Sequence, residues 1–200
     1  MPTTRLSNFY VHQEPSWRAL ISRSDRRVPA QWRDWLLDKG SLTQRLIDAS
    51  DNRLSVRILS QRIDVPKFTE QRALSLPPRR LAMIREVVLM ADSIPWVYAR
   101  SIIPLTTLTG RLRKLRHLDN RPLGALLFND PSMTREEVEV ACFTTSNEEL
   151  PADLGDIQRP IWGRRSVFRL DAKPLLVSEI FLPDFKPYNQ TLNLGFGGAL

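Results

Sequence analysis

The feature that most constrains the fold is the segment LAMIREVVLM at residues 81–90. It is apolar apart from one Arg–Glu step, and an apolar run of this length between turn-forming segments predicts a buried strand. At the two-residue period of a strand, Arg85 shares a face with Met83, Val87 and Leu89. A guanidinium on an apolar face needs an anionic partner, because desolvating an unpaired charge is costly.

A second lone charge occupies an equivalent position near the C-terminal end. The segment at residues 174–183 predicts a strand in which Glu179 shares a face with Val177 and Phe181. The pattern leaves two explanations open, a direct salt bridge between Arg85 and Glu179 or a mostly apolar pocket that has one charge at each end. Such a pocket would suit a small cyclic acid that also carries a hydroxyl group. Arg85 would bind the carboxylate and Glu179 would accept from the hydroxyl.

The remaining pattern predicts an α+β fold. Two short helices are expected within residues 29–49, where they could lie over a sheet as a lid, and two helical pieces within residues 107–128. Residues 64–80 are rich in proline and are predicted to be mostly loop. The strands follow one another at hairpin spacing and do not alternate with helices, which favours an antiparallel sheet with helices on one side. About six strands are predicted, at residues 54–63, 81–90, 96–103, 136–143, 162–170 and 174–183.

The sequence predicts one domain with a terminal segment on each side. We predict a basic N-terminal extension at residues 1–27, one domain at residues 28–188 and a flexible C-terminal tail at residues 189–200. Within the domain, residues 144–160 are predicted to form a long polar loop.

The charge balance favours anionic partners without choosing among them. The formal net charge is +7, and residues 110–117 form the densest basic run. This run has no interleaved aromatic residues for base stacking, so it is interpreted as the solvated face of an amphipathic helix and no nucleic acid is expected. Arg164 and Arg165 point to opposite faces of a predicted strand and are interpreted as surface or edge residues.

The scarcity of reactive residues narrows the chemistry. Cys142 is the single cysteine, so no intramolecular disulfide is possible and a cytoplasmic location is expected. Neither His12 nor His117 has another histidine or a cysteine at ligand spacing, and the GFGG at residues 195–198 does not open a helix after a strand. No apolar run approaches the ~20 residues of a membrane span. We therefore expect no metal, cofactor or covalent nucleophile, and no membrane span.

Six stretches occur in the order of a known family. They are DWLL, SLTQRL, REVVLMADSIPW with an R-x-x-x-P at Arg100 to Pro104, PLGALLF, WGRRSVFRL and KPLLVSEIFLP. Over residues 32–188 the chain thereby resembles the chorismate pyruvate-lyases, which make 4-hydroxybenzoate for ubiquinone biosynthesis.

The resemblance implies a fold and a set of site residues. The fold is a six-stranded antiparallel sheet with helical flaps over a buried ligand site. Arg85 would bind the ring carboxylate and Glu179 the 4-hydroxyl, and the backbones of Leu42 and Leu123 would contact the carboxylate. The family more often has methionine where this chain has Leu42. The expected partners are chorismate, 4-hydroxybenzoate and pyruvate, and a monomer that needs no cofactor is expected.

Other functions remain open on sequence grounds. A protein of the same fold could bind a small carboxylate as an effector without catalysis, or could be a lyase that gives 3-hydroxybenzoate. A basic peripheral protein could instead bind a membrane or nucleic acid through residues 18–27 and 110–117.

Overall fold

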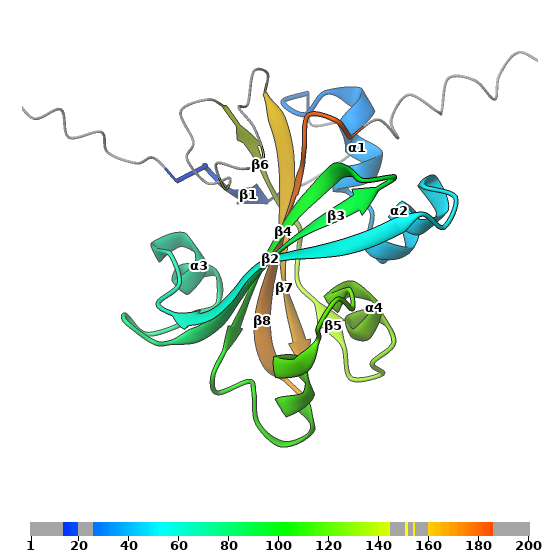
Figure 1. Ribbon diagram of the computed structural model, residues 1–200. Coiled ribbons are helices and arrows are strands. Elements are labelled where there is room, and N and C mark those ends of the chain that lie inside the picture. Colours follow the sequence, from blue (N-terminus) through cyan, green and yellow to red (C-terminus); the bar gives the residue numbers. More distant parts are fainter. Residues whose placement is uncertain (1–13, 20–25, 145–150, 152–153, 155–159, 186–200) are drawn as a thin grey trace, which may run out of the picture.

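The protein is organised around one antiparallel sheet, seen in a computed structural model that describes residues 14–19, 26–144, 151, 154 and 160–185 (Figure 1). Within these residues the sheet has eight strands in the order β1-β6-β7-β8-β4-β3-β2, and β5 also pairs with β7. The strands are β1 (Arg18–Ala19), β2 (Leu54–Asp64), β3 (Ala82–Ala91), β4 (Ile94–Pro104), β5 (Thr134–Arg135), β6 (Glu139–Phe143), β7 (Ile161–Leu170) and β8 (Lys173–Phe181). The helices are α1 (Ala30–Leu36), α2 (Leu42–Ala49), α3 (Phe68–Ala73), α4 (Leu123–Phe128) and the 3₁₀-helix η1 (Gly110–His117).

The α+β class is confirmed, whereas the expectation of six strands is wrong. The six longer strands correspond to the six predicted ones, and β1 and β5 make eight. Each of the two additional strands has only two residues, which is too short for alternation of apolar and polar side chains to reveal it. β1 comes from the N-terminal extension and pairs with β6. The predicted C-terminal tail lies outside the described residues, as does most of the loop predicted at residues 144–160.

The register of the central strands places the two predicted charges close together. β4 lies between β3 and β8, with Arg85 opposite Ser101 and Glu179 opposite Ala99. Two strand spacings of about 4.8 Å put the backbones of β3 and β8 about 10 Å apart. Arg85 and Glu179 therefore stand on the same face of the sheet, one strand apart.

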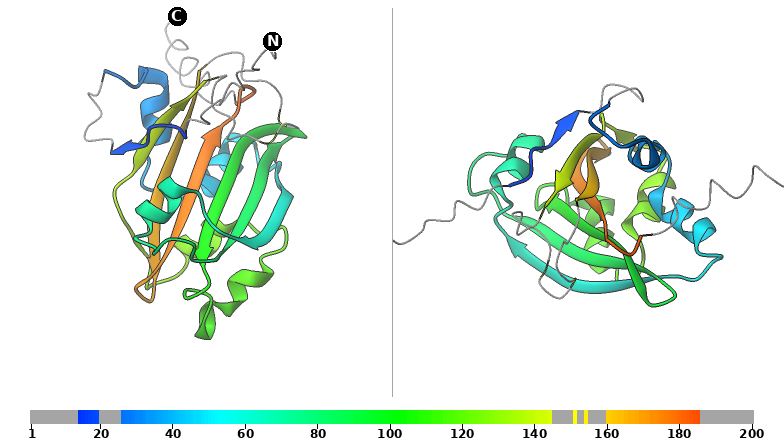
Figure 2. Two further views of the ribbon diagram at one scale, coloured as in Figure 1. Left: turned by 90° about the vertical axis from the view of Figure 1, so that its left-hand side faces the viewer. Right: turned by 90° about the horizontal axis from the view of Figure 1, so that it is seen from above.

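Helices cover both faces of the sheet, which differs from the predicted one-sided arrangement. Figures 1 and 2 show α1, α2 and α4 on one side and α3 on the other. Helix α3 lies within residues 64–80, which were predicted to be mostly loop, and six residues are too few for a clear helical period. Its Glu70 is buried against the sheet. Because both faces are covered, β3 is buried on both sides, and this explains its nearly continuous apolar sequence.

Two apolar clusters flank a polar belt on the α1–α2–α4 face. At one end, Trp32 and Trp35 of α1 pack with Leu46 of α2 over β3, β4 and β8. At the other end, leucines of η1 and α4 pack on Met83, Ile103 and their neighbours. Helix α2 has a side-chain cap at its N-terminal end, since the Gln44 amide donates to Ser41 Oγ over 3.3 Å. Arg85 and Glu179 lie in the belt between these clusters.

Candidate functional site

A small cavity lies between the sheet and the N-terminal ends of α2 and α4. Its volume is about 30 Å³. The sheet contributes two charged groups, one from β3 and one from β8, and the helices cover them. The lining consists of Thr43, Arg85, Val87, Leu89, Ala99, Ser101, Pro122, Leu123, Gly124, Val177 and Glu179. Arg85 and Glu179 are the charged members of an otherwise mostly apolar wall, which is the usual composition of a small-ligand site.

Arg85 is buried without a carboxylate partner among the residues that the structure describes. It is 2 % exposed. Its Nη1 donates to Gln61 Oε1 over 3.3 Å, and its Nη2 donates to the carbonyls of Asp119 (2.7 Å) and Arg121 (3.3 Å). Burial lowers the pKa of the guanidinium, and the Asp119 charge opposes that shift. The acceptors that Arg85 contacts directly are neutral, so its charge at the cavity wall is only partly compensated by the nearby Asp119.

The hydrogen bonds of Arg85 also leave donors for a ligand. They use three N–H groups, so the Nε–H and one Nη1–H are left. The acceptors of Nη2 lie in the segment just before Pro122 and Leu123, which cover the cavity. One guanidinium therefore faces the cavity and also holds the segment that leads into α4.

Glu179 is paired with Arg164 of β7. Its Oε2 accepts from Arg164 Nε over 2.7 Å, and Glu179 forms no ion pair with Arg85 in the described part of the chain. The direct Arg85–Glu179 salt bridge, one of the two explanations left open by the sequence, is therefore wrong. Both residues instead line one cavity.

Arg164 and Arg165 are not surface or edge residues, contrary to the prediction. They are 1 % and 6 % exposed, because β7 lies inside the sheet and is covered on both faces. Arg164 points to the cavity side and Arg165 to the opposite face, where its Nε donates to Glu139 Oε2 over 2.6 Å. Arg135 is a further cation close to Arg164 and Glu179. Burial lowers the pKa of Arg135 to about 10, and the charge of Arg164 lowers it in the same direction. Sequence reasoning missed these roles, since two-sided burial of β7 depends on distant helices.

The two leucines predicted to offer backbone contacts both begin a helix. Leu42 is the first residue of α2 and Leu123 the first residue of α4. The amide N–H of a first helical residue has no partner within its helix, so it can serve an external acceptor. Leu123 lines the cavity directly, whereas Leu42 is buried next to the lining residue Thr43.

A buried ionic network on the opposite face was not predicted. Glu86, which follows Arg85 in β3, accepts from Tyr98 Oη (2.6 Å) and from Arg100 Nη1 (2.9 Å). Arg100 Nε also donates to Glu70 Oε1 of α3 over 2.7 Å. Although burial opposes it, donation from Ser60 and Tyr98 lowers the pKa of Glu86 to about 2. The Arg–Glu step in LAMIREVVLM thus serves both faces, with Arg85 at the cavity and Glu86 in this network.

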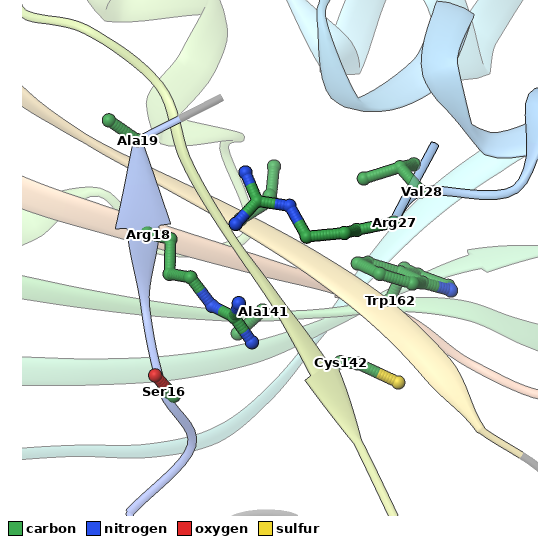
Figure 3. A pocket seen from close by; sticks show the side chains of 9 residues that line it. Ser16, Arg18, Ala19, Arg27, Val28, Ala141, Cys142 and Trp162 are labelled. Atoms are coloured by element: carbon green, nitrogen blue, oxygen red, sulfur yellow. The ribbon is translucent and has the colours of Figure 1, made fainter. Parts of the chain in front are cut away.

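A larger cavity of about 410 Å³ lies at the β1–β6 edge, away from Arg85 and Glu179. Figure 3 shows Arg18, Arg27, Cys142 and Trp162 around it. Burial raises the pKa of the Cys142 thiol, which disfavours the thiolate. Its lining lacks a carboxylate that could pair with a ligand hydroxyl. The smaller cavity therefore fits the predicted chemistry better.

The basic run at residues 110–117 can also be compared with its predicted amphipathic helix. The leucines of the basic run are buried, as Leu112 and Leu115 show, but the segment is a 3₁₀-helix. Over the described ranges, no three His, Cys, Asp or Glu side chains gather where they could hold a metal ion. No helix in the same ranges is long and apolar enough to cross a membrane.

Comparisons with known structures support the fold. The C-terminal domain of the histidine utilization repressor from Pseudomonas syringae pv. tomato superimposes with a TM-score of 0.52 at 13% identity, over 74% of this chain and 99% of that chain. A GntR-family transcriptional regulator from Bacillus cereus gives 0.50 at 13% identity, over the same shares. At these identities the likeness concerns the fold alone.

Comparisons with sequences identify the family. A probable chorismate pyruvate-lyase from Aromatoleum aromaticum is 43% identical over 162 residues, which cover 78% of this chain and 87% of that protein. A chorismate pyruvate-lyase from Erwinia tasmaniensis is 38% identical over 150 residues, which cover 75% and 77%. The family model for chorismate lyase matches residues 17–191. The chain therefore belongs to the chorismate lyase family.

Proposed function

We propose that the protein is a chorismate pyruvate-lyase, which converts chorismate to 4-hydroxybenzoate and pyruvate for ubiquinone biosynthesis. The observation that carries the proposal is the buried Arg85 guanidinium, which faces a cavity without a carboxylate partner among the described residues and shares that cavity with Glu179. An aromatic acid that carries a para hydroxyl complements both groups. Its carboxylate compensates the cation, and its hydroxyl donates to the carboxylate.

Each predicted site residue has a specific role in this proposal. Arg85 uses its remaining Nε–H and Nη1–H on the ring carboxylate, and the amides of Leu42 and Leu123 add further donors. Glu179 accepts from the hydroxyl at the other end of the ring. Arg164 and Arg135 make this region net positive, which attracts chorismate, a dianion.

The reaction needs positioning more than reactive groups. The bond between the ring and the ether oxygen of the enolpyruvyl group breaks, and the ring carbon that carries the hydroxyl gives up its hydrogen. The ring becomes aromatic, and the side chain leaves as pyruvate after it takes up the proton. The protein holds the ring, excludes water and stabilises the negative charge that develops on the ether oxygen. The cations near Glu179 are placed to supply this last effect.

The helices at the cavity act as flaps in this proposal. The cavity of about 30 Å³ is smaller than an aromatic acid needs, and Thr43 of α2 and Gly124 of α4 meet over it. Ligand entry and release therefore require α2 and α4 to move apart. Opening of such a cover is expected to limit turnover, so a burst of 4-hydroxybenzoate should precede the steady state.

Chorismate turnover by Arg85→Ala and Glu179→Ala tests the site. Both variants should lose at least about 100-fold in kcat/KM, because each removes a charge-assisted contact in a site that excludes water. Arg165→Ala and Glu139→Ala are the controls, since they break an ion pair of a buried arginine and a partly exposed glutamate on the opposite face of the sheet. Turnover of both site variants at the rate of these controls would contradict the assignment.

The same assay separates the alternative functions. An effector-binding module would bind 4-hydroxybenzoate and leave chorismate unchanged, and a lyase of different specificity would release 3-hydroxybenzoate. Chromatography of the aromatic product distinguishes these outcomes in one experiment.

We also propose that the enzyme is a cytoplasmic monomer. The cavity is complete within one chain, and Cys142, the single cysteine of the sequence, gives no disulfide that would require an oxidising compartment. Light scattering of the purified protein tests the oligomeric state.

A further inference from the structure

The side chain of Arg164 is placed to orient the carboxylate of Glu179. The two residues are direct neighbours on β7 and β8, and the arginine is 1 % exposed. Its Nε donates to Glu179 Oε2 over 2.7 Å. This is the only hydrogen bond of the Glu179 side chain among the described residues, so Oε1 is left for a ligand hydroxyl.

The same guanidinium also binds the segment that leads into α2. Arg164 Nη1 donates to the carbonyls of Trp35 and Asp38, each over 2.9 Å. Trp35 is in the last turn of α1, where carbonyls have no partner within the helix, and Asp38 lies in the linker to α2. Arg135 Nη1 supports this attachment from β5 with a 3.2 Å bond to the Asp38 carbonyl.

These contacts make Arg164 a counterpart of Arg85. Arg85 holds the segment before α4 through the carbonyls of Asp119 and Arg121. Arg164 holds the segment before α2 through the carbonyls of Trp35 and Asp38. Each helix over the cavity is thus attached to an arginine at one end of the site.

We propose that Arg164 is a positioning residue for the ligand site. It holds the Glu179 carboxylate in the orientation that accepts the ligand hydroxyl, and it ties that orientation to the closed position of the α1–α2 linker. The inference rests on the proposed function, because it assumes that Glu179 meets the hydroxyl of the ligand. A carboxylate ordered before binding loses less conformational entropy when the ligand arrives, and this raises affinity and lengthens occupancy.

A purely structural ion pair would make different predictions. Arg165, the next residue of β7, provides this comparison, since its buried side chain pairs with the partly exposed Glu139 of β6 on the opposite face. Breaking either pair should destabilise the fold. Only the Arg164 pair should change how the site distinguishes ligands.

The experiment compares 4-hydroxybenzoate with benzoate, which lacks the hydroxyl. Dissociation constants are measured by calorimetry for the parent protein and for Arg164→Gln, Arg165→Gln and Glu179→Ala. The parent protein should prefer 4-hydroxybenzoate by about 10- to 100-fold, as expected for one charge-assisted hydrogen bond. Glu179→Ala should abolish most of this preference, Arg164→Gln should reduce it at least about threefold, and Arg165→Gln should keep it. Stopped-flow measurements should also show faster release of 4-hydroxybenzoate from Arg164→Gln.

The outcomes separate failure of this inference from failure of the proposed function. An unchanged preference in Glu179→Ala would contradict the role of Glu179 itself. A reduced preference in Glu179→Ala together with a parental preference in Arg164→Gln would overturn the positioning role alone. If Arg164→Gln does not fold, Arg164→Lys replaces it in the same measurements. Its ammonium keeps the charge but cannot reproduce the planar fork, so preference and release rate should lie between those of the parent and Glu179→Ala. Parental values for both quantities would overturn the inference.

Discussion

Substitution of Gly124 by alanine would test the contact between the two covering helices. A Cβ at this position would lie 2.7 Å from Thr43 Oγ1 and 3.6 Å from Thr43 Cβ. Ordinary van der Waals contact begins at 3.4 Å, so Thr43 or one of the helices must move by about 0.7 Å (3.4 − 2.7). Both residues line the cavity, so the strain falls on its cover.

The expected loss of stability is modest because two effects oppose each other. Overpacking at a buried contact costs about 1–3 kcal/mol, whereas alanine is about 1 kcal/mol better than glycine within a helix. The net loss of folding stability is therefore about 0–2 kcal/mol. The open and closed states share the helical gain, so overpacking of at least about 1–2 kcal/mol remains between them and raises the open population about 5- to 30-fold.

Release of 4-hydroxybenzoate, followed by stopped-flow fluorescence, measures this effect. Gly124→Ala should release the product faster by a similar factor and should lower Tm by a few degrees. The additional substitution Thr43→Ala removes the atom that the new Cβ meets, so the double variant should recover most of the parental release rate. Release that stays fast in the double variant, or is unchanged in Gly124→Ala, would refute the account of the α2–α4 contact.

Two further predictions concern stability. Because the folded-state pKa of Glu86 is lowered to about 2 from an ordinary value of 4.5, its carboxylate stabilises the fold above about pH 5, and that contribution is lost as the pH falls toward 2. Glu86→Gln should therefore lower the free energy of unfolding more at pH 7 than at pH 3, as measured by urea titration, and an equal loss at both pH values would contradict this linkage. Gly163→Ala would place a Cβ 2.8 Å from Phe143 Cε2 and 3.1 Å from the carbonyl of Glu179, so a loss of about 1–3 kcal/mol is expected. A parental urea midpoint would show that β7 and β8 adjust without strain.

The two charged residues that line the small cavity could be predicted from the sequence alone. Arg85 and Glu179 each stand out because the two-residue period of a strand places them among apolar neighbours. The same reasoning did not predict the burial of Arg164. That burial depends on α1 and on the linker to α2, which lie more than a hundred residues earlier in the chain. Glu86 was overlooked for a similar reason. Its partner Arg100 comes from β4, and Arg100 is in turn paired with Glu70 of a helix too short to be recognised.

The sequence by itself determined the α+β class, the six longer strands and the presence of lone charges on apolar faces. These features are local, because they follow from the periodicity and the turn residues of short segments. Only the tertiary structure decided which partner each charge has. Strand order places β4 between β3 and β8, so that Arg85 and Glu179 face one cavity, while the ion pair of Glu179 is formed by Arg164. Pairing of charges depends on distances between residues far apart in the chain, and the pattern of a single strand carries no information about them.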